Sequence, residues 1–249
     1  MGKEQIKVEY IDHMGSDLST VNSARVSFDK ESEFDEVWEY DGNAPPEGFT
    51  EDDHYDSDIN IGMCGYRKLK DSDKKLIKYL ANHKHMTPFR HNQIQIRCHA
   101  PIFIARQLGK HQAGLSWNEV SRRYVDSEPE FFVPDEWRLR PDGSIKQGSG
   151  GVVEQNAGII EGMKKTNNDM ITLYKGLMGL GVAPEQARMV LPQSMMTSWY
   201  WTGNLISFAH VYKERIAEGA QLEAQWFAED LDKVIRPLFP ESWSALVDG

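Results

Sequence analysis

Alternation of apolar and polar residues predicts three β-strands in this chain. Residues 6–11, IKVEYI, alternate along their whole length, and residues 195–203, MMTSWYWTG, combine β-branched and aromatic side chains, which strands favour. In residues 91–99, HNQIQIRCH, every second side chain lies on one face, which is made by Asn92, Ile94, Ile96 and Cys98. We expect this strand to have an apolar side and a polar side.

Helical periodicity and end signals predict helices between these strands, within residues 17–26, 71–83, 101–111, 156–181, 183–192, 205–216 and 220–239. Ser16 or Asp17 is the expected N-cap of the first helix, Ser72 of the second and Asn204 of the sixth. In the third helix Arg106 and Lys110 are one turn apart, so both can project toward an anion. Gly109 and Gly114 predict a loop after it. The pattern indicates an α+β fold with one sheet covered by helices.

The composition is that of a globular protein. The chain has 249 residues, 40% of them hydrophobic, which is enough for one domain with a full core. The first ten residues lack the apolar run of a signal peptide, and no stretch approaches about eighteen consecutive apolar residues. The two cysteines, Cys64 and Cys98, are too few for a disulfide framework. We therefore expect a cytoplasmic protein that makes no use of a membrane.

Negative charge is concentrated in residues 29–58. This segment holds thirteen Asp or Glu residues and one lysine, whereas the whole chain has a formal net charge of -10, so the remainder is nearly neutral. Its composition, which includes a Pro-Pro pair and two glycines, favours a solvated insertion, with a functional lid as the alternative. A strong negative field repels phosphate chains, so we expect no binding to a nucleic-acid polymer.

Cations gather instead in residues 110–124, KHQAGLSWNEVSRRY. A lysine, a histidine and two arginines stand there beside one carboxylate and several hydrogen-bonding side chains. The chain contains no G-x-G-x-x-G or Walker loop, so a phosphate site would have to be made by side chains. The segment therefore predicts an arginine-rich site for an anionic ligand.

Three other chemistries fit these residues less well. A metal site is suggested by five histidines near Cys98, but their spacing does not match that of zinc ligands; they are His83, His85, His91, His99 and His111. Cys98 lies on the apolar face of its strand, which favours an inert buried thiol over a nucleophile. Ser121 lacks a G-x-S-x-G elbow and an obvious orienting acid, so we expect no serine hydrolase.

Several separated motifs resemble flavin-dependent thymidylate synthases, whose signature usually reads R-H-R-x-x-S-x-N-E-x-S-x-R-Y. Here APIFIARQ at 100–107 precedes residues 110–124, which carry that signature in altered form. The other matching motifs follow in the family's order: LSTVNSARVSF at 18–28, HMTPFRH at 85–91, ARMVLP at 187–192 and WTGNLISFAHVYKER at 201–215. The resemblance spans nearly the whole chain apart from the acidic segment and the loop RPDGSIKQGSGG.

The resemblance implies a fold and a reaction. The expected fold is a single catalytic domain over residues 1–249, with a mostly antiparallel sheet covered by helices and an acidic insertion at about 29–58. The expected reaction converts dUMP to dTMP with a one-carbon unit from methylenetetrahydrofolate and a hydride from FAD that NADPH has reduced. These ligands carry phosphates or carboxylates, which explains a cationic pocket. The partners implied are a nucleotide, a folate and further copies of the chain in a homotetramer whose sites draw on several subunits.

The matching positions supply the expected site residues. Nucleotide contacts are implied for Gln107, Lys110, Glu119, Ser121, Arg123, Arg188 and Arg215. Flavin contacts are implied for Ser27, His85, Thr87, Lys110, His111, Gln112, Glu119, Asn204 and His210. Arg215 is the expected catalytic residue, because the matching arginine of the family faces the pyrimidine and stabilises negative charge that develops on the ring. Ser121 is assigned to binding, since the family delivers hydride to the ring without an enzyme nucleophile.

The chain departs from the family pattern at several positions. Lys110 and Gln112 stand where arginines are usual, one residue is added before Ser116, and Ile206 replaces a frequent arginine. Lysine lacks the planar fork of arginine and Gln112 lacks the charge, so we expect weaker or rearranged contacts to the flavin phosphate or the folate. The alternatives are a related flavin-dependent methylase or hydroxymethylase acting on dCMP or dUMP, and a silent module that only binds nucleotide or flavin.

Overall fold

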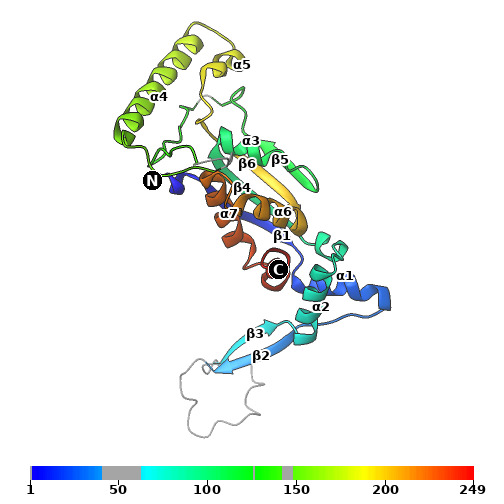
Figure 1. Ribbon diagram of the computed structural model, residues 1–249. Helices are drawn as coiled ribbons and strands as arrows, with labels where there is room; N and C mark the ends of the chain where they lie inside the picture. Colours follow the sequence, from blue (N-terminus) through cyan, green and yellow to red (C-terminus); the bar gives the residue numbers. More distant parts are fainter. Residues whose placement is uncertain (1, 41–62, 126, 142–147) are drawn as a thin grey trace, which may run out of the picture.

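A four-stranded antiparallel sheet forms the centre of the fold (Figure 1). The computed structural model describes residues 2–40, 63–125, 127–141 and 148–249. The expected α+β fold with a mostly antiparallel sheet is confirmed, and so are the three strands predicted from alternation. In spatial order the strands are β1 (Lys7–Met14), β4 (Gln93–Pro101), β6 (Met196–Asn204) and β5 (Leu115–Glu119).

The central pair of strands, β4 and β6, is in register over the nine residues of each strand. Ile96 lies opposite Trp201 and Cys98 lies opposite Trp199, and all four side chains are buried. Aromatic and apolar cross-strand pairs of this kind each stabilise a sheet by about 0.2–1 kcal/mol. Burial raises the pKa of the Cys98 thiol well above its usual range, so the expected inert cysteine is confirmed.

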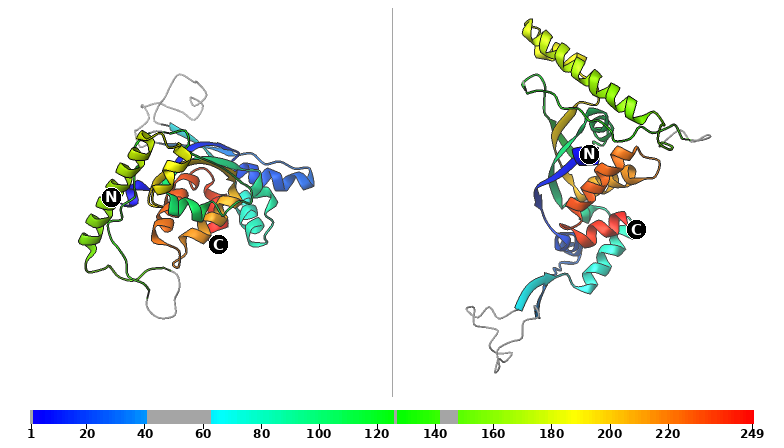
Figure 2. Two further views of the ribbon diagram at one scale, coloured as in Figure 1. Left: turned by 90° about the horizontal axis from the view of Figure 1, so that it is seen from above. Right: turned by 90° about the vertical axis from the view of Figure 1, so that its left-hand side faces the viewer.

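Helices cover the buried face of this sheet (Figure 2). Helices α6 and α7 pack against each other, α7 also contacts β1, and α8 packs against α6, α1 and α2. The ring of Phe208 on α6 meets Trp201 edge to face, with centroids 5.5 Å apart. The core therefore lies between the sheet and this helical layer. The bounds of its helices are α1 (Asp17–Arg25), α2 (Asp71–Asn82), α6 (Leu205–Ile216), α7 (Leu222–Ile235) and α8 (Pro240–Val247).

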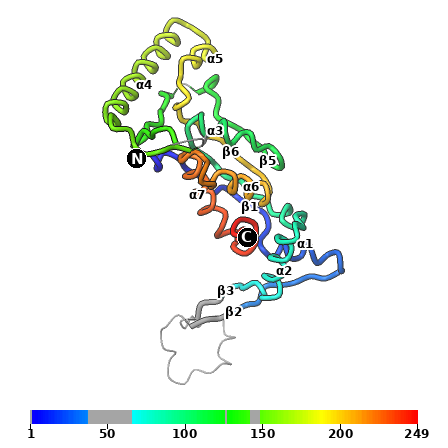
Figure 3. Tube along the Cα trace, in the orientation of Figure 1, coloured from blue at the N-terminus to red at the C-terminus, as the bar shows by residue number. Residues whose placement is uncertain are grey.

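The remaining helices lie at the edges of the molecule. Helix α3 (Ile102–Leu108) continues directly from β4, whereas α4 (Asn156–Gly179) and α5 (Pro184–Ala187) stand apart from the sheet (Figure 3). Only Asn167 and Tyr174 of α4 are buried, so most of this helix is open in a single chain. In the described part of the chain no helix has both the length and the apolarity to span a membrane. Short 3-10 helices complete the connections: η1 (Lys3–Gln5), η2 (Val26–Phe28), η4 (Thr87–Arg90) and η5 (Arg188–Val190).

The beginning of the acidic segment has regular structure, although residues 29–37 are all exposed or half-buried. Strand β2 (Asp35–Tyr40) pairs with β3 (Met63–Lys68) in a two-stranded antiparallel sheet. Before β2, the backbone N–H of Ser32 donates to Asn22 Oδ1 at 2.8 Å, and Ser32 Oγ donates to the buried carboxylate of Asp73. These hydrogen bonds tie the segment to α1 and α2. The rest of the expected insertion lies outside the described residues.

Two helix ends differ from their predictions. Lys70, not Ser72, occupies the N-cap of α2, because the helix already begins at the residue before Ser72. Helix α3 ends at Leu108, so Lys110 lies beyond it and the expected pairing with Arg106 along one helix face is wrong. The helix stops where Gly109 follows, since glycine disfavours a helical backbone. Residues 109–114 form the expected loop, and strand β5 begins directly after it at Leu115.

A buried carboxylate joins the first helix of the chain to the last. Asp17, at the start of α1, accepts hydrogen bonds from the backbone N–H groups of Glu241 at 2.9 Å and Ser242 at 2.8 Å. Both N–H groups belong to the first turn of α8, where a helix leaves its donors without internal partners. Because Asp17 is only 6% exposed, little water is available to replace it as an acceptor.

We expect Asp17→Ala to lower the free energy of unfolding by about 1–3 kcal/mol, because two N–H groups at the start of α8 lose their acceptor. Urea unfolding followed by tryptophan fluorescence measures the change, with Asp169→Ala on the exposed side of α4 as the matched control. An unfolding free energy equal to that of the parent protein would show that α8 does not depend on this cap.

Candidate functional site

Arg215 and His111 form the centre of the candidate site. Arg215 lies near the C-terminal end of α6, and His111 lies just beyond α3, 104 positions earlier in the chain. The Nε and Nη2 atoms of Arg215 contact His111 Nε2 at 3.1 and 2.8 Å. The ring of His210, also on α6, meets the His111 ring edge to face with centroids 5.5 Å apart. Three of the expected site residues therefore meet at one point.

The surroundings of His111 determine its charge. Desolvation lowers the pKa of His111 below its ordinary value, and the nearby Arg215 and His210 lower that pKa further by electrostatic interaction. The neutral imidazole is therefore favoured, and its Nε2 lone pair accepts from the guanidinium while Nδ1 carries the hydrogen. The remaining N–H groups of Arg215 stay available for a ligand.

The segment between α3 and β5 is held against the start of α6. Asn204 caps α6 as predicted, because its Oδ1 accepts from the backbone N–H of Ser207 at 2.9 Å. Ser207 Oγ donates in turn to the backbone carbonyl of Ala113 at 2.8 Å. Gly114 has a φ of +71°, and a Cβ at this position would come within 2.5 Å of Ser207 Oγ, so only glycine fits without a shift. These contacts position the expected ligand residues Lys110, His111 and Gln112.

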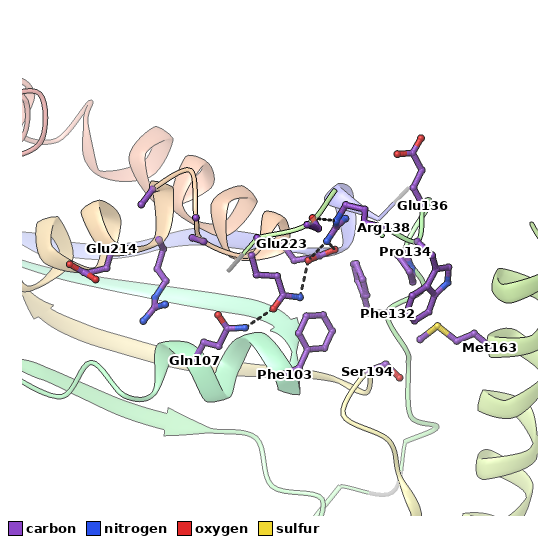
Figure 4. Close-up of a pocket in the computed structure, with 18 residues that line it drawn as sticks. Phe103, Gln107, Phe132, Pro134, Glu136, Arg138, Met163, Ser194, Glu214 and Glu223 are labelled. Atoms are coloured by element: carbon purple, nitrogen blue, oxygen red, sulfur yellow. Dashed lines mark hydrogen bonds and ion pairs between the residues drawn. The ribbon is translucent and has the colours of Figure 1, made fainter. Parts of the chain in front are cut away.

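Three cavities around this cluster share side chains. The largest, about 970 Å³, is lined by Gln107 and Arg215 among others (Figure 4). A second, about 770 Å³, is lined by Gln107 and Glu119 together with the residues from Lys110 to Gln112. A third, about 440 Å³, is lined by Glu119 and Arg188. Because Gln107 and Glu119 each line two of them, the three cavities are neighbours.

Strand β5 carries Glu119 toward β6, where Thr197 Oγ1 donates to Glu119 Oε1 at 2.8 Å. Ser121 and Arg123 follow the strand, and Arg123 Nε donates to Ser121 Oγ at 3.4 Å. Arg123 is exposed, as is Arg188, whose Nε donates to a backbone carbonyl of the preceding turn. Within one chain, these hydrogen bonds connect the residues expected to bind phosphate to their neighbours. None of them reaches the Arg215–His111 pair.

The flavin residues expected from the N-terminal half line a separate cavity of about 670 Å³. Ser27 lies on η2, Thr87 on η4, and His85 between α2 and η4. Arg25 also lines this cavity, and its Nε is buried without a hydrogen-bond partner in the structure described. A buried N–H of this kind suits an acceptor on a ligand, such as a phosphate or carbonyl oxygen.

The histidines near this cavity stack with an aromatic ring. Tyr79 lies against His83 with ring centroids 4.1 Å apart, and His83 lies 6.3 Å from His85 in nearly parallel orientation. Stacked rings do not direct their nitrogens to a common point. Among the described residues, no group of three or more His, Cys, Asp or Glu is placed to hold a metal ion.

Polar side chains that no sequence motif identified line the largest cavity. Gln221 and Glu223 line it together with Arg138. Glu223 is 3% exposed and lies on the same stripe of α7 as the buried Phe227 and Leu231, one and two turns later. A carboxylate within an apolar helical stripe is almost never buried unless it has a partner, and this signal in the sequence could have identified it.

The sequence matches known proteins along most of its length. Residues 9–241 match the family model described as thymidylate synthase complementing protein. The chain is 32% identical over 248 residues to the flavin-dependent thymidylate synthase of Thermosipho africanus, and the match covers 95% of this chain and 89% of that protein. It is 33% identical over 241 residues to the protein of the same name from Thermosipho melanesiensis, with 95% and 88% covered.

Solved structures match the fold as well. Two crystal structures of the UMP/dUMP methylase PolB from Streptomyces cacaoi, bound with 5-Br dUMP or 5-Br UMP, align with TM-scores of 0.74 and 0.75. Their sequence identities to this chain are 27% and 26%, and each alignment covers 98% of it and at least 94% of the other chain. The sequence alignments and the structural alignments thus both cover nearly the whole chain. The chain belongs to the thymidylate synthase complementing protein family.

Proposed function

We propose that this chain is a flavin-dependent thymidylate synthase, which methylates dUMP to dTMP with methylenetetrahydrofolate, FAD and NADPH. The observation that carries the proposal is the Arg215–His111 pair, whose guanidinium lines the largest cavity beside Gln107. Relatives that are 32% and 33% identical are named for this activity. The proposed location is the cytoplasm. The proposed substrates are a nucleotide and a folate.

Cationic side chains would hold the nucleotide and stabilise the reacting ring. Arg123, Arg188 and Lys110 provide the charge for a phosphate, with Ser121 as a neutral donor and Glu119 as an acceptor. Negative charge develops on the pyrimidine as the new bond forms, and Arg215 would face that charge. Because His111 already holds the guanidinium, Arg215 need not reorient when the charge appears, which is the condition for effective electrostatic stabilisation.

The cavity near Ser27 fits a flavin. Its hydroxyl and imidazole groups, with the unpaired Nε of Arg25, match the acceptors and donors of a flavin nucleotide. When bound and reduced by NADPH, FAD would supply a hydride to the nucleotide ring, and the transferred carbon would end as a methyl group. Lys110 and Gln112, with His111, Asn204 and His210, are proposed to complete the flavin contacts. Gln112 would contribute amide hydrogen bonds in place of a charge.

A homotetramer would bring the separate ligand residues together. Most of α4 is exposed, and the nearby Leu180 and Met189 are 84% and 79% exposed. Large exposed apolar side chains beside a long open helix are typical of protein interfaces. Sites built from several chains also explain why the flavin cavity is separate from the Arg215 cluster in one chain.

One observation favours a second candidate function. PolB, with which this chain aligns over nearly its whole length, is described as a methylase of both UMP and dUMP. The altered positions Lys110 and Gln112 lie beside the proposed substrate region. The second candidate is therefore a related flavin-dependent methylase or hydroxymethylase whose acceptor is another pyrimidine nucleotide, such as dCMP or UMP.

Mass analysis of the nucleotide product tests the proposal. The protein is incubated with FAD, NADPH, methylenetetrahydrofolate and one nucleotide at a time, either dUMP, dCMP or UMP. We expect dTMP from dUMP and no change in the other two nucleotides. A methylated or hydroxymethylated product from dCMP or UMP alone would support the second candidate. Bound FAD without any product would show a silent binding module.

We expect Arg215→Lys to slow product formation about 10- to 100-fold in a single turnover, because lysine keeps the charge but loses the fork that His111 holds. Reduced, FAD-loaded protein is mixed with saturating dUMP and methylenetetrahydrofolate without oxygen, and product is quantified over time. Flavin content should be unchanged. The control is Arg67→Lys on the exposed part of β3. Product formation at the parent rate would exclude Arg215 from the chemistry.

The Arg215–His111 hydrogen bond should weaken in acid. The folded-state pKa of His111 is lowered, so its contribution to stability is fully present above the ordinary histidine pKa of about 6.5 and is lost as pH falls through the folded value. We expect the unfolding free-energy difference between the parent protein and His111→Gln to shrink between pH 8 and pH 5. Urea titrations at each pH measure it, with the exposed His91→Gln as control. A difference independent of pH would contradict this role of the neutral imidazole.

A further inference from the structure

A chain of hydrogen bonds crosses the largest cavity from a buried ion pair to Gln107 (Figure 4). Arg138 Nη2 donates to the two carboxylate oxygens of Glu223 at 2.7 and 2.8 Å. Gln221 Nε2 donates to Glu223 Oε2 at 2.9 Å, and Gln107 Nε2 donates to Gln221 Oε1 at 2.7 Å. We call these four residues the amide relay. Its far end is held by Ser149, whose Oγ accepts from Arg138 Nε at 2.8 Å.

The ion pair fixes the direction of every hydrogen bond in the amide relay. Glu223 forms a salt bridge with Arg138, in which both of its carboxylate oxygens accept hydrogen bonds. Gln221 must therefore turn its NH2 group toward Glu223, which leaves its carbonyl facing Gln107. Gln107 must then donate with its own NH2 group, because two facing carbonyls would share no hydrogen. The chemistry of the charged end thus decides the orientations of both amides.

Gln107 consequently has its carbonyl oxygen left for a ligand. In the part of the chain that the structure describes, no side chain or backbone group donates to Gln107 Oε1. Arg215 lines the same cavity with N–H groups that are free of His111. The wall of the cavity therefore offers an acceptor at Gln107 and donors at Arg215. A uracil nucleotide has the complementary groups, since its carbonyl oxygens accept and its ring N3–H and 3′-hydroxyl donate.

We propose that the amide relay makes Gln107 a specificity-determining acceptor for an N–H or O–H group of the nucleotide. Gln221, Glu223 and Arg138 act as positioning residues, because they reach the ligand only through Gln107. A ligand that placed an acceptor at the same point would leave two oxygens facing each other without a hydrogen. The inference rests on the proposed function, since it takes the ligand of this cavity to be a pyrimidine nucleotide.

A double-mutant cycle on the affinity of the FAD-loaded protein for dUMP tests the relay. Gln221→Met keeps the size of the side chain and removes both of its hydrogen bonds, so the Gln107 amide can turn either way. We expect this change to weaken dUMP binding about 3- to 10-fold in calorimetric titrations, with flavin content and melting temperature unchanged. In a Gln107→Met background the same change should have no further effect. Gln155→Met, at an exposed position before α4, is the matched control.

Two nucleotide analogues identify the donor that Gln107 contacts. N3-methyl-dUMP lacks the ring N–H, and 2′,3′-dideoxyuridylate lacks the 3′-hydroxyl. The analogue without the contacted donor should bind the parent protein and Gln221→Met equally, whereas the other should lose affinity as dUMP does. Glu223→Gln should reproduce the Gln221→Met pattern if it folds, because an amide in place of the carboxylate no longer sets the direction of the hydrogen bonds.

The outcomes separate this inference from the proposed function. Parent protein that bound no pyrimidine nucleotide would refute the proposed function and the inference with it. Normal dUMP binding by the parent protein, with unchanged affinity in Gln221→Met, would overturn the inference alone. The inference alone would also be overturned if Gln221→Met lost equal affinity for dUMP and for both analogues. It would be overturned too if Gln221→Met still weakened dUMP binding in the Gln107→Met background. Either result would show a merely structural effect.

Discussion

The register between β4 and β6 determines where the site can form. The strands are antiparallel, so the helices that follow them, α3 and α6, begin at opposite ends of the pair. Arg215, near the end of α6, meets His111, which lies just beyond the end of α3. Burial of Trp199 and Trp201 fixes the register, because a slip of one residue would turn both rings to the other face of the sheet. The position of the Arg215 guanidinium thus depends on tryptophan packing.

Elements with a strong core pattern could be predicted from the sequence, and elements stabilised by pairing alone could not. Strands β4 and β6 and helix α6 repeat apolar side chains with the period of their own structure, and these residues fill the core. Strand β5 is only five residues long, so the alternation of Leu115 and Trp117 with Ser116 and Asn118 is too short to predict a strand. Strand β2 is rich in acidic residues, and its partner β3 comes from beyond the acidic segment. Strands that pair across such a long separation in sequence leave no signal in any short stretch of the chain.

Residue types in the site were predictable, but their partners were not. The cap that Asn204 makes on α6 could be predicted from its motif, because a cap is a local interaction. The hydrogen bond from Arg215 to His111 joins positions that only the folded sheet brings together. Glu223 could have been noticed as a charge on an apolar stripe, yet its partner Arg138 lies on a segment without regular structure. Tertiary contacts of this kind are not encoded in any short motif.

Two arginines at the same cavity have opposite electrostatic roles. Arg138 is paired with the buried carboxylate of Glu223, so its charge is neutralised and serves to orient the amides. Arg215 is held by an imidazole that the local environment keeps neutral, and among the described residues it forms no salt bridge. A carboxylate in the place of His111 would hold Arg215 as firmly but would cancel the charge that the ligand meets. An acidic chain with a formal net charge of -10 can therefore keep an unpaired cation at this cavity, because a neutral group positions that cation.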